Sequence, residues 1–301
     1  MNDQAEALRN LVRQDEGAPL FRAEPAETRP TRILTITSGK GGVGKSNFTL
    51  NFALQLQSQG YKVLVFDADI GMANIDVLMG ASPKYNLYHL LKREKSIEEI
   101  IYRGHNDLQF IAGGSGFNDL LSLTKEELEY FTEQVLSLSG SLDFILFDTG
   151  AGLTKESMTF ITAAEQTIVV TTPEPTSITD AYAIIKMVHS QEPGIRFQLV
   201  VNRVTDRKEG QQTADKIRMV SNQFPQLDIP TLGYIPDDAN VSKAVKRQVP
   251  FSVLYPDSAA TRELKELVRR FEQSQPATAP TEAEEGGGVK RFLSRMLKFM
   301  K

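Results

Sequence analysis

The stretch with the clearest chemical signature is Ser38-Gly39-Lys40-Gly41-Gly42-Val43-Gly44-Lys45-Ser46. It fits the G-x-x-x-x-G-K-[ST] pattern at every fixed position, namely Gly39, Gly44, Lys45 and Ser46. Glycines allow backbone N–H groups to turn inward around a phosphate chain. Lys45 is then expected to reach the β- and γ-phosphates, and the Ser46 hydroxyl to ligate Mg²⁺. The pattern therefore predicts a site for the phosphates of a nucleotide.

Carboxylates at the ends of two other apolar runs fit the same chemistry. Asp148 follows Phe144–Phe147 and forms a Walker B pattern, which predicts a Mg²⁺ ligand near Ser46. Asp67 and Asp69 end a second run of this kind, and we expect them to face the same phosphates because the carboxyl ends of parallel strands share one edge. The alternative for these two is an ordinary aspartate-rich loop after a strand.

The elements around the glycine-rich loop are those that this chemistry requires. Residues 32–37 read as a strand, and residues 47–59 read as an amphipathic helix. Such a helix directs its unpaired amides and its positive dipole end at a bound anion. A glycine-rich turn with a chance lysine, the competing interpretation, does not require a strand and a helix in register.

Composition limits the possible classes of protein. The chain has 301 residues, of which 41% are hydrophobic and 24% charged, enough for one α/β domain of about 250 residues plus tails. The absence of cysteine excludes disulfides, thiolate metal sites and iron–sulfur clusters. The net charge of −4 gives no indication of a basic nucleic-acid surface, so we expect no nucleic acid partner. Apolar runs stay shorter than the roughly 18 residues of a membrane span.

Strand-like and helix-like stretches alternate through the central region. Strands are expected at 32–37, 62–67, 108–111, 144–148, 167–172, 197–202 and 232–235, and helices at 47–59, 124–138, 177–189, 213–224 and 258–273. This alternation predicts an α/β fold with a mainly parallel sheet flanked by helices. Together with the phosphate-binding motif it predicts a single P-loop NTPase domain, with a flexible N-terminal leader and a C-terminal amphipathic helix outside it. The expected boundaries are 1–31 for the leader and linker, 32–273 for the ATPase domain, 274–288 for a flexible acidic linker and 289–301 for the terminal helix.

The terminal stretch of residues 289–301 has a basic amphipathic pattern. Its cationic residues give +5 without an acid, and an apolar stripe recurs at helical spacing: Val289, Phe292, Leu293, Met296, Leu297 and Met300. A helix of this length is roughly 20 Å long, too short to cross a bilayer. The pattern is typical of an anchor on an anionic membrane surface. A helix docked on the protein's own core is the alternative, and the glycine-rich linker argues against it.

The leader contains a short helix candidate at residues 3–13, with Leu8, Leu11 and Val12 on one face. Glycine and prolines then interrupt any regular pattern up to Pro30. So short a helix is marginal alone in water. The leader is either disordered or a peptide that folds on a partner.

Lys40, a second lysine at the start of the loop, is the deviant Walker A signature and resembles the MinD/ParA family of ATPases. The resemblance implies ATP and Mg²⁺ as ligands and a homodimer in which Lys40 reaches the partner's nucleotide. It also implies that Asp69 orients the attacking water and touches the metal shell, with Asp67 in support. The implied catalytic residues are Asp69, Lys40 and Lys45, and the implied metal ligands are Ser46, Asp69 and Asp148.

Adenine recognition rests on the same resemblance. The family reads the base at the ends of two later strands, which here contain Asn202 and the run Ile235-Pro236-Asp237. By residue chemistry alone, Asn202 can equally cap a loop. The full set of expected nucleotide-binding residues is Gly39, Lys40, Gly41, Gly42, Val43, Gly44, Lys45, Ser46, Asn47, Asn202, Ile235, Pro236 and Asp237.

Two segments favour one branch of the family. Residues 69–76 resemble the branch of MinD and the flagellar regulators of the FlhG type, and Asp3-Gln4-Ala5-Glu6-Ala7-Leu8-Arg9 matches the flagellar leader pattern Asp-Gln-Ala-x-x-Leu-Arg. This implies an ATPase that regulates flagellar number and placement and activates the GTPase FlhF through Gln4, Leu8 and Arg9, with flagellar C-ring proteins as further partners. It also implies a cytoplasmic protein that is reversibly peripheral on the inner face of the cell membrane.

Other functions stay open at this level. Within the family, the alternatives are a MinD-type regulator of the cell-division site and a ParA-type partition ATPase. Outside it, a small-molecule P-loop ligase needs a substrate pocket, and a nucleotide-bound scaffold shows no ATP turnover.

Overall fold

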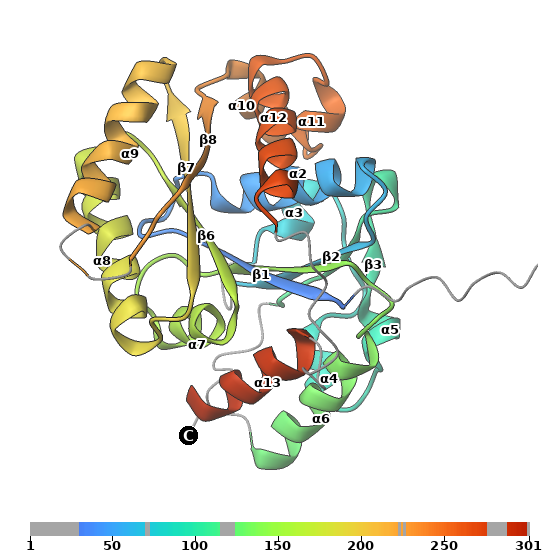
Figure 1. The fold of residues 1–301 in the computed structure, drawn as a ribbon. Helices are drawn as coiled ribbons and strands as arrows, with labels where there is room; N and C mark the ends of the chain where they lie inside the picture. The colour runs from blue at the N-terminus through green and yellow to red at the C-terminus, as the bar shows by residue number, and fades with distance from the viewer. Residues whose placement is uncertain are drawn as a thin grey trace, which may run out of the picture.

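An eight-stranded sheet runs through the molecule, with the order β3-β4-β2-β5-β1-β6-β7-β8 (Figure 1). In the computed structural model, residues 30–69, 73–114, 124–221, 224, 227–275 and 288–299 are described. The strands are β1 (Arg32–Thr37), β2 (Val63–Ala68), β3 (Tyr102–Arg103), β4 (Gln109–Ile111), β5 (Phe144–Thr149), β6 (Gln166–Thr171), β7 (Arg196–Val204) and β8 (Thr231–Pro236). Neighbouring strands are parallel except for the β3–β4 pair at one edge. The predicted α/β fold with a mainly parallel sheet is confirmed.

The central strands are apolar because helices cover both of their faces. Every residue of β2, β5 and β6 is buried, as expected for a parallel sheet inside two helical layers. The register pairs Ile36 of β1 with Asp148 of β5, and Asp148 with Asp67 of β2. The glycine-rich loop and both aspartates therefore meet at one edge of the sheet.

The helices form a layer on each side of the sheet. Their bounds are α2 (Lys45–Ser58), α3 (Ile75–Met79), α4 (Leu87–Leu91), α5 (Ile97–Ile100), α6 (Lys125–Ser137), α7 (Lys155–Ala163), α8 (Pro175–Gln191), α9 (Arg207–Ser221), α10 (Ala239–Lys246), α11 (Phe251–Leu254), α12 (Ala259–Gln273) and α13 (Gly288–Phe299), with a 3-10 turn η1 (His105–Asp107). Helices α2 and α12 cover one side of the central strands, whereas α6, α7 and α13 cover the other (Figure 1). Helices α8 and α9 pack on β6 and β7.

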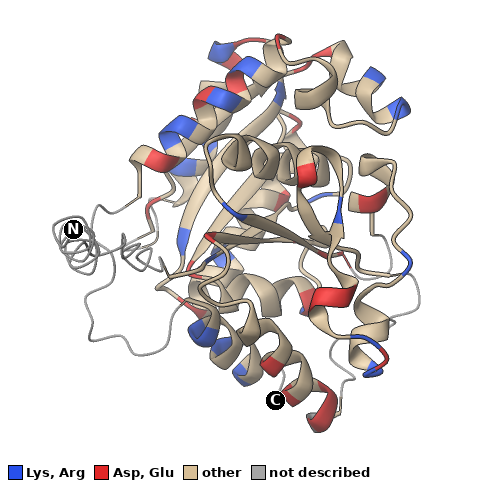
Figure 2. Ribbon diagram, turned by 90° about the vertical axis from the view of Figure 1, so that its right-hand side faces the viewer, with Lys and Arg blue, Asp and Glu red and all other residues tan. Residues whose placement is uncertain are grey.

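Charge is mixed along the helices at the surface. Basic and acidic residues alternate on α12, which runs across the upper left of Figure 2. In the described part of the chain, none of the helices combines the length and the apolar character needed to cross a membrane.

Helix α13 forms where the terminal amphipathic helix was predicted, but its apolar side is not free. Val289, Phe292, Leu293 and Met296 are buried in the cluster under β1, β2 and β5. Arg291 adds an ion pair to Glu165, with 2.8 Å between Nη1 and Oε1. The expectation that the glycine-rich linker keeps this helix off the core is therefore corrected. The physical reason is that an apolar stripe gains by leaving water whether a membrane or a protein surface covers it. Met300 lies outside the described residues.

Candidate nucleotide site

The glycine-rich loop joins β1 to α2. At two of its positions, Gly39 and Gly44, the surroundings leave no room for a Cβ. Gly44 precedes α2 with φ of 90°, a left-handed conformation that favours glycine. A Cβ at Gly44 would collide with the Asn202 amide, and one at Gly39 would collide with the backbone of Asp180 and Ala181. The loop is thus held between α2, α8 and the end of β7, with the amides at the start of α2 directed at the site.

Lys45 lies deep in this site and is paired with carboxylates. Its side chain is only 6% exposed, and its Nζ lies 3.0 Å from Asp148 Oδ1 and 3.8 Å from Asp69 Oδ2. Thr49, one turn further along α2, donates its hydroxyl to the same Asp148 oxygen at 2.8 Å. The structure thus brings together Lys45, Asp69 and Asp148, which were predicted to take part in the phosphate and metal chemistry.

The second carboxylate oxygen of Asp148 supplies a test of whether a metal fits. Oδ2 is buried and has no hydrogen-bond partner among the described residues, a costly arrangement unless a ligand completes it. Among those residues, no group of three or more His, Cys, Asp or Glu side chains could hold a metal unaided. Mg²⁺ is usually held by one or two protein oxygens together with phosphates and water. Asp148 and Ser46 fit that role.

Asp67 and Asp69 differ in their surroundings. Asp67 is fully buried and accepts backbone N–H bonds from Asp69, Asn74 and Ile75 at 3.2, 2.9 and 3.0 Å. Its burial and the nearby Asp148 raise its pKa to about 7. Asp67 therefore fixes the loop that carries Asp69. The Asp69 side chain is 19% exposed. Its partial burial raises its pKa, and the nearby Lys45 opposes this shift.

Lys40 is paired with the start of α8. Its Nζ lies 3.0 Å from Glu174 Oε2 and 3.2 Å from the Thr176 hydroxyl, both at the start of α8. The Lys40 side chain is 43% exposed. A group outside the chain can therefore reach this lysine.

The residues expected to read the base lie at the ends of β7 and β8. Asn202 is paired in register with Ile235, and its amide Nδ2 donates to the Val43 carbonyl of the glycine-rich loop at 2.8 Å. Asp237 forms a long, exposed ion pair of 3.7 Å with Arg203. The neighbouring Asp238 caps α10. Asn202 therefore borders the loop, and the contact of Asn202, Ile235, Pro236 and Asp237 with a base stays a prediction.

Some of the site's residues were not indicated by sequence. Thr49 was missed, although its position four residues after Lys45 places it on the same helix face. Glu174 and Thr176 were missed because only the packing of α8 against the loop brings them to Lys40. The leader residues Gln4, Leu8 and Arg9 lie outside the described part of the chain.

A parallel sheet, a glycine-rich phosphate loop, a buried Lys45–Asp148 pair and an outward-facing Lys40 together define a P-loop ATPase of the deviant Walker A class. Residues 34–251 match the CobQ/CobB/MinD/ParA nucleotide binding domain, and the chain belongs to this family.

Relatives and solved structures agree with this assignment. The chain is 35% identical to the flagellum site-determining protein YlxH of Helicobacter pylori over the full length of both. It is 30% identical to the antiactivator FleN of Pseudomonas aeruginosa over 89% of this chain and 94% of that protein. Its fold matches the septum site-determining protein MinD of Pyrococcus horikoshii, solved with Mg-ADP, at a TM-score of 0.67 and 27% identity over 81% and 96% of the two chains.

Proposed function

We propose that this protein is an ATP-dependent dimerising ATPase that associates with the membrane, regulates flagellar number and placement, and stimulates the GTPase FlhF through its leader. The full-length similarity to a flagellum site-determining protein carries the flagellar part of this proposal. The exposed Lys40 beside the phosphate loop supports the dimer. C-ring proteins are proposed as further partners.

In the proposed ATP hydrolysis, Lys45 exchanges its partner Asp148 for the phosphates. Lys45 leaves Asp148 when it binds the phosphates, so that Asp148 Oδ1 keeps only its hydrogen bond from Thr49, and Oδ2 has no partner among the described residues. Asp148 and Ser46 would hold Mg²⁺, which would supply positive charge against the charge that develops on the phosphates. Asp69, whose Oδ2 lies 3.8 Å from Lys45 Nζ, then orients the attacking water. Closing the site around the phosphates excludes bulk water and strengthens these interactions.

The proposed dimer places two phosphate sites face to face. Lys40 of each subunit exchanges Glu174 for the phosphates of the other subunit. An exposed pair such as Lys40–Glu174 contributes only about 0.2–1 kcal/mol, so a charge-assisted contact with phosphate can replace it. Dimerisation thereby depends on ATP.

Membrane association requires α13 to leave the core. In the docked helix, the side chains that would enter a bilayer are covered, while Lys290 and Lys298 are exposed. The neighbouring α6 carries Glu126, Glu127 and Glu129, whose charge repels an anionic surface. One released helix binds reversibly, and two held in a dimer gain avidity of roughly 10²–10⁴. The protein is then cytoplasmic as a monomer and peripheral on the inner face of the membrane as a dimer.

Sedimentation with anionic liposomes tests this proposal, with size-exclusion chromatography of the same samples to report the dimer. We expect ATP to produce both the dimer and liposome binding, and ADP to produce neither. A variant without residues 288–301 should keep the ATP-dependent dimer and lose liposome binding. Equal binding by that variant, or a monomer in ATP, would contradict the proposal.

A further inference from the structure

The Thr49 hydroxyl lies between the backbone of its own helix and the Walker B carboxylate. Thr49 is completely buried in α2. Its Oγ1 is 2.8 Å from Asp148 Oδ1 and 3.0 Å from the carbonyl oxygen of Lys45. A hydroxyl carries one hydrogen, so it donates fully to only one of two acceptors at a time. The bond to Asp148 is the principal one, because it is the shorter and because its acceptor is a carboxylate.

Thr49 belongs to a largely apolar part of α2. Its neighbours in the helix include buried apolar side chains, namely Phe48, Leu50, Phe52 and Ala53. A buried hydroxyl costs free energy unless it is hydrogen-bonded. The carbonyl oxygen of Lys45, four residues earlier, would satisfy the Thr49 hydroxyl by itself. The contact with Asp148 is therefore not needed to stabilise α2, which points to a role at the carboxylate.

The contact fixes one oxygen of the Asp148 carboxylate. Lys45 Nζ and Thr49 Oγ1 both approach Oδ1, at 3.0 and 2.8 Å, whereas Oδ2 is buried and has no partner among the residues that the structure describes. The terminal torsion of an aspartate is broad, so donors on one oxygen determine how the carboxylate is turned. The lysine side chain is long and flexible, whereas the branched side chain of a helical threonine has few rotamers. Thr49 is thus the more rigid of the two donors.

We propose that Thr49 is a positioning residue whose hydroxyl holds Asp148 Oδ1, keeps Oδ2 available to Mg²⁺ and so sets the Mg²⁺ dependence of nucleotide binding. This inference rests on the proposed function in taking ATP as the ligand of the site. Ser46 is the residue expected to ligate the ion directly, whereas Thr49 acts on the ion through Asp148 alone. Removing a partner that holds a metal ligand typically lowers metal affinity by about 10–100-fold.

Equilibrium binding of a fluorescent, non-hydrolysable ATP analogue over a range of Mg²⁺ concentrations tests this inference without turnover. Thr49→Val keeps the shape of the side chain and removes the hydroxyl. It should raise the Mg²⁺ concentration at which binding is half-maximally enhanced by about tenfold or more. The affinity for the analogue in EDTA should stay close to that of the natural protein, which also shows that the variant is folded. Thr49→Ala removes the same hydroxyl with a smaller side chain and should give the same shift.

Two further variants separate positioning from packing. Thr49→Ser keeps the hydroxyl and should restore the Mg²⁺ dependence of the natural protein.

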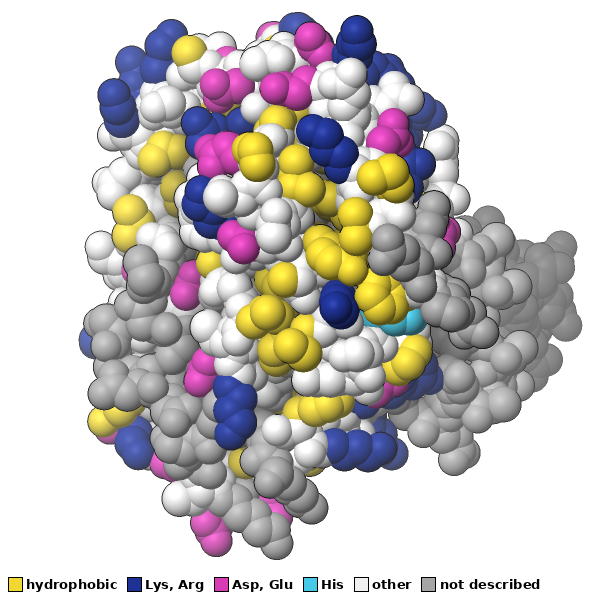
Figure 3. Space-filling model, turned by 90° about the vertical axis from the view of Figure 1, so that its left-hand side faces the viewer, with side chains coloured by type: hydrophobic (Ala, Val, Ile, Leu, Met, Phe, Trp, Pro, Cys, Tyr) yellow, Lys and Arg dark blue, Asp and Glu magenta, His cyan; other side chains and the backbone are white. Residues whose placement is uncertain are grey.

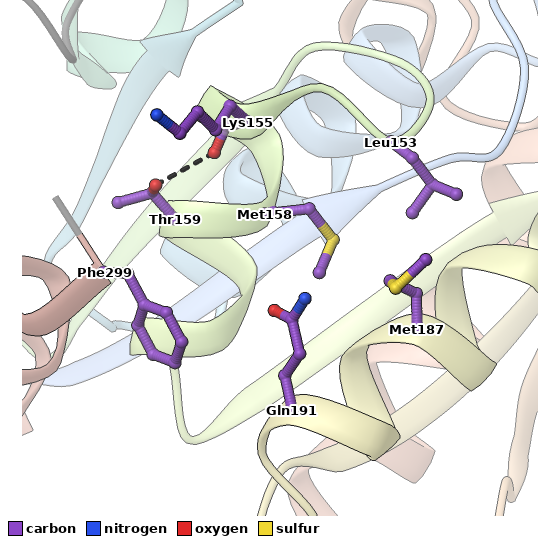
Figure 4. Close-up of a pocket in the computed structure, with 7 residues that line it drawn as sticks. All are labelled: Leu153, Lys155, Met158, Thr159, Met187, Gln191 and Phe299. Carbon is purple, nitrogen blue, oxygen red and sulfur yellow. Dashed lines mark hydrogen bonds between the residues drawn. The ribbon is translucent and has the colours of Figure 1, made fainter.

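Thr159→Val is the matched control, because Thr159 is also a buried helical threonine but donates to the carbonyl of Lys155, at 2.9 Å, and not to a carboxylate (Figure 4). Thr159 lines a pocket with Met158 of α7 and Met187 of α8, and none of the residues that line this pocket belongs to the nucleotide site. Met187 is 43% exposed, and apolar side chains are exposed on the side of the molecule formed by α8 and α9 (Figure 3). Thr159→Val should leave the Mg²⁺ dependence unchanged.

The possible results distinguish this inference from the proposed function. An unchanged Mg²⁺ dependence in both Thr49→Val and Thr49→Ala would overturn the inference and leave the proposed ATP hydrolysis standing. A shift in Thr49→Ser as large as that in Thr49→Val would also overturn it, because the loss of packing would then be the cause. If the natural protein binds the analogue equally well with Mg²⁺ and with EDTA, both this inference and the proposed hydrolysis fail.

Discussion

Lys40 and Glu174 form an ion pair within one chain, with 3.0 Å between Nζ and Oε2. The pair joins the glycine-rich loop to the start of α8, and both side chains are substantially exposed. Lys40 therefore lies beside the glycine-rich loop while its charge is paired with α8. Because an exposed ion pair of this kind is weak, Lys40 can exchange Glu174 for a phosphate of a second subunit with little loss of free energy.

Replacing Lys40 should separate dimerisation from nucleotide binding. Lys40→Ala is expected to keep monomeric ATP affinity, because Lys45 and the loop amides make the contacts to the chain's own nucleotide, and to lose the ATP-dependent dimer. Light scattering after size-exclusion chromatography measures this directly.

Glu174→Gln is the matched control for that experiment. Glu174→Gln removes the partner of Lys40 but keeps the lysine. The dissociation constant of the ATP-dependent dimer should therefore change by less than about fivefold, because exposed ion pairs contribute little. An ATP-bound dimer of unchanged strength in Lys40→Ala would show that the lysine does not cross the interface.

Asp69 should matter for hydrolysis more than for binding. Its Oδ2 lies 3.8 Å from Lys45 Nζ, a weaker contact than the 3.0 Å pair with Asp148. Asp69→Ala should therefore retain nucleotide binding, while turnover falls by about 100-fold or more, as for the loss of a proton-transfer or positioning group. Calorimetry and phosphate release measure the two effects separately. Turnover close to that of the natural protein would assign the water to another side chain.

Asp67 predicts a pH dependence of stability. Its pKa is raised to about 7 in the folded chain by burial and by Asp148, against roughly 3.9 when unfolded. Its contribution is fully present below the unfolded pKa and is lost as pH rises through the folded pKa. Without nucleotide, the free energy of unfolding should therefore fall between about pH 4 and pH 7, as followed by urea denaturation. In Asp67→Asn this decrease should be smaller. An identical profile in both proteins would show that Asp67 is charged throughout.

Sequence reasoning located the phosphate site because its geometry follows from local patterns. The strand ahead of Lys45, the run that ends at Asp148 and the run that ends at Asp67 each predict a parallel strand, and parallel strands must end at one edge. The same reasoning missed Thr49 and Glu174, which depend on how α2 and α8 pack around that edge. Neither contact follows from a repeat or a spacing in the chain.

The position of the terminal helix was beyond sequence reasoning for a different reason. The stripe from Val289 to Met296 was predicted correctly as the apolar side of a helix. An apolar stripe fits a bilayer and a protein core equally well, because the hydrophobic effect has no direction. Whether the stripe packs on the protein core depends on the complementary surface around Phe147 and Phe160. Those residues lie more than a hundred positions away in the chain.

We propose that the leader acts on another enzyme. The sequence predicts a short helix at residues 3–13 with Leu8, Leu11 and Val12 on one face, and a helix of that length is marginal alone in water. Such a segment can fold on a partner. Gln4 and Arg9 then supply hydrogen-bond donors, and a donor added to a nucleotide site can stabilise the charge of a phosphoryl-transfer transition state.

A synthetic peptide of residues 1–20 should therefore raise GTP hydrolysis by FlhF in the absence of the ATPase domain. Gln4→Ala in the peptide should reduce the stimulation by removing a donor, and Leu8→Ala should reduce it by removing buried apolar area. A peptide of the same composition in scrambled order controls for charge. In the whole protein, Lys45→Ala should leave the stimulation intact, because the leader and the phosphate site act separately. If a saturating peptide leaves GTP turnover unchanged, the leader is not an activator, and the flagellar assignment then depends on overall similarity alone.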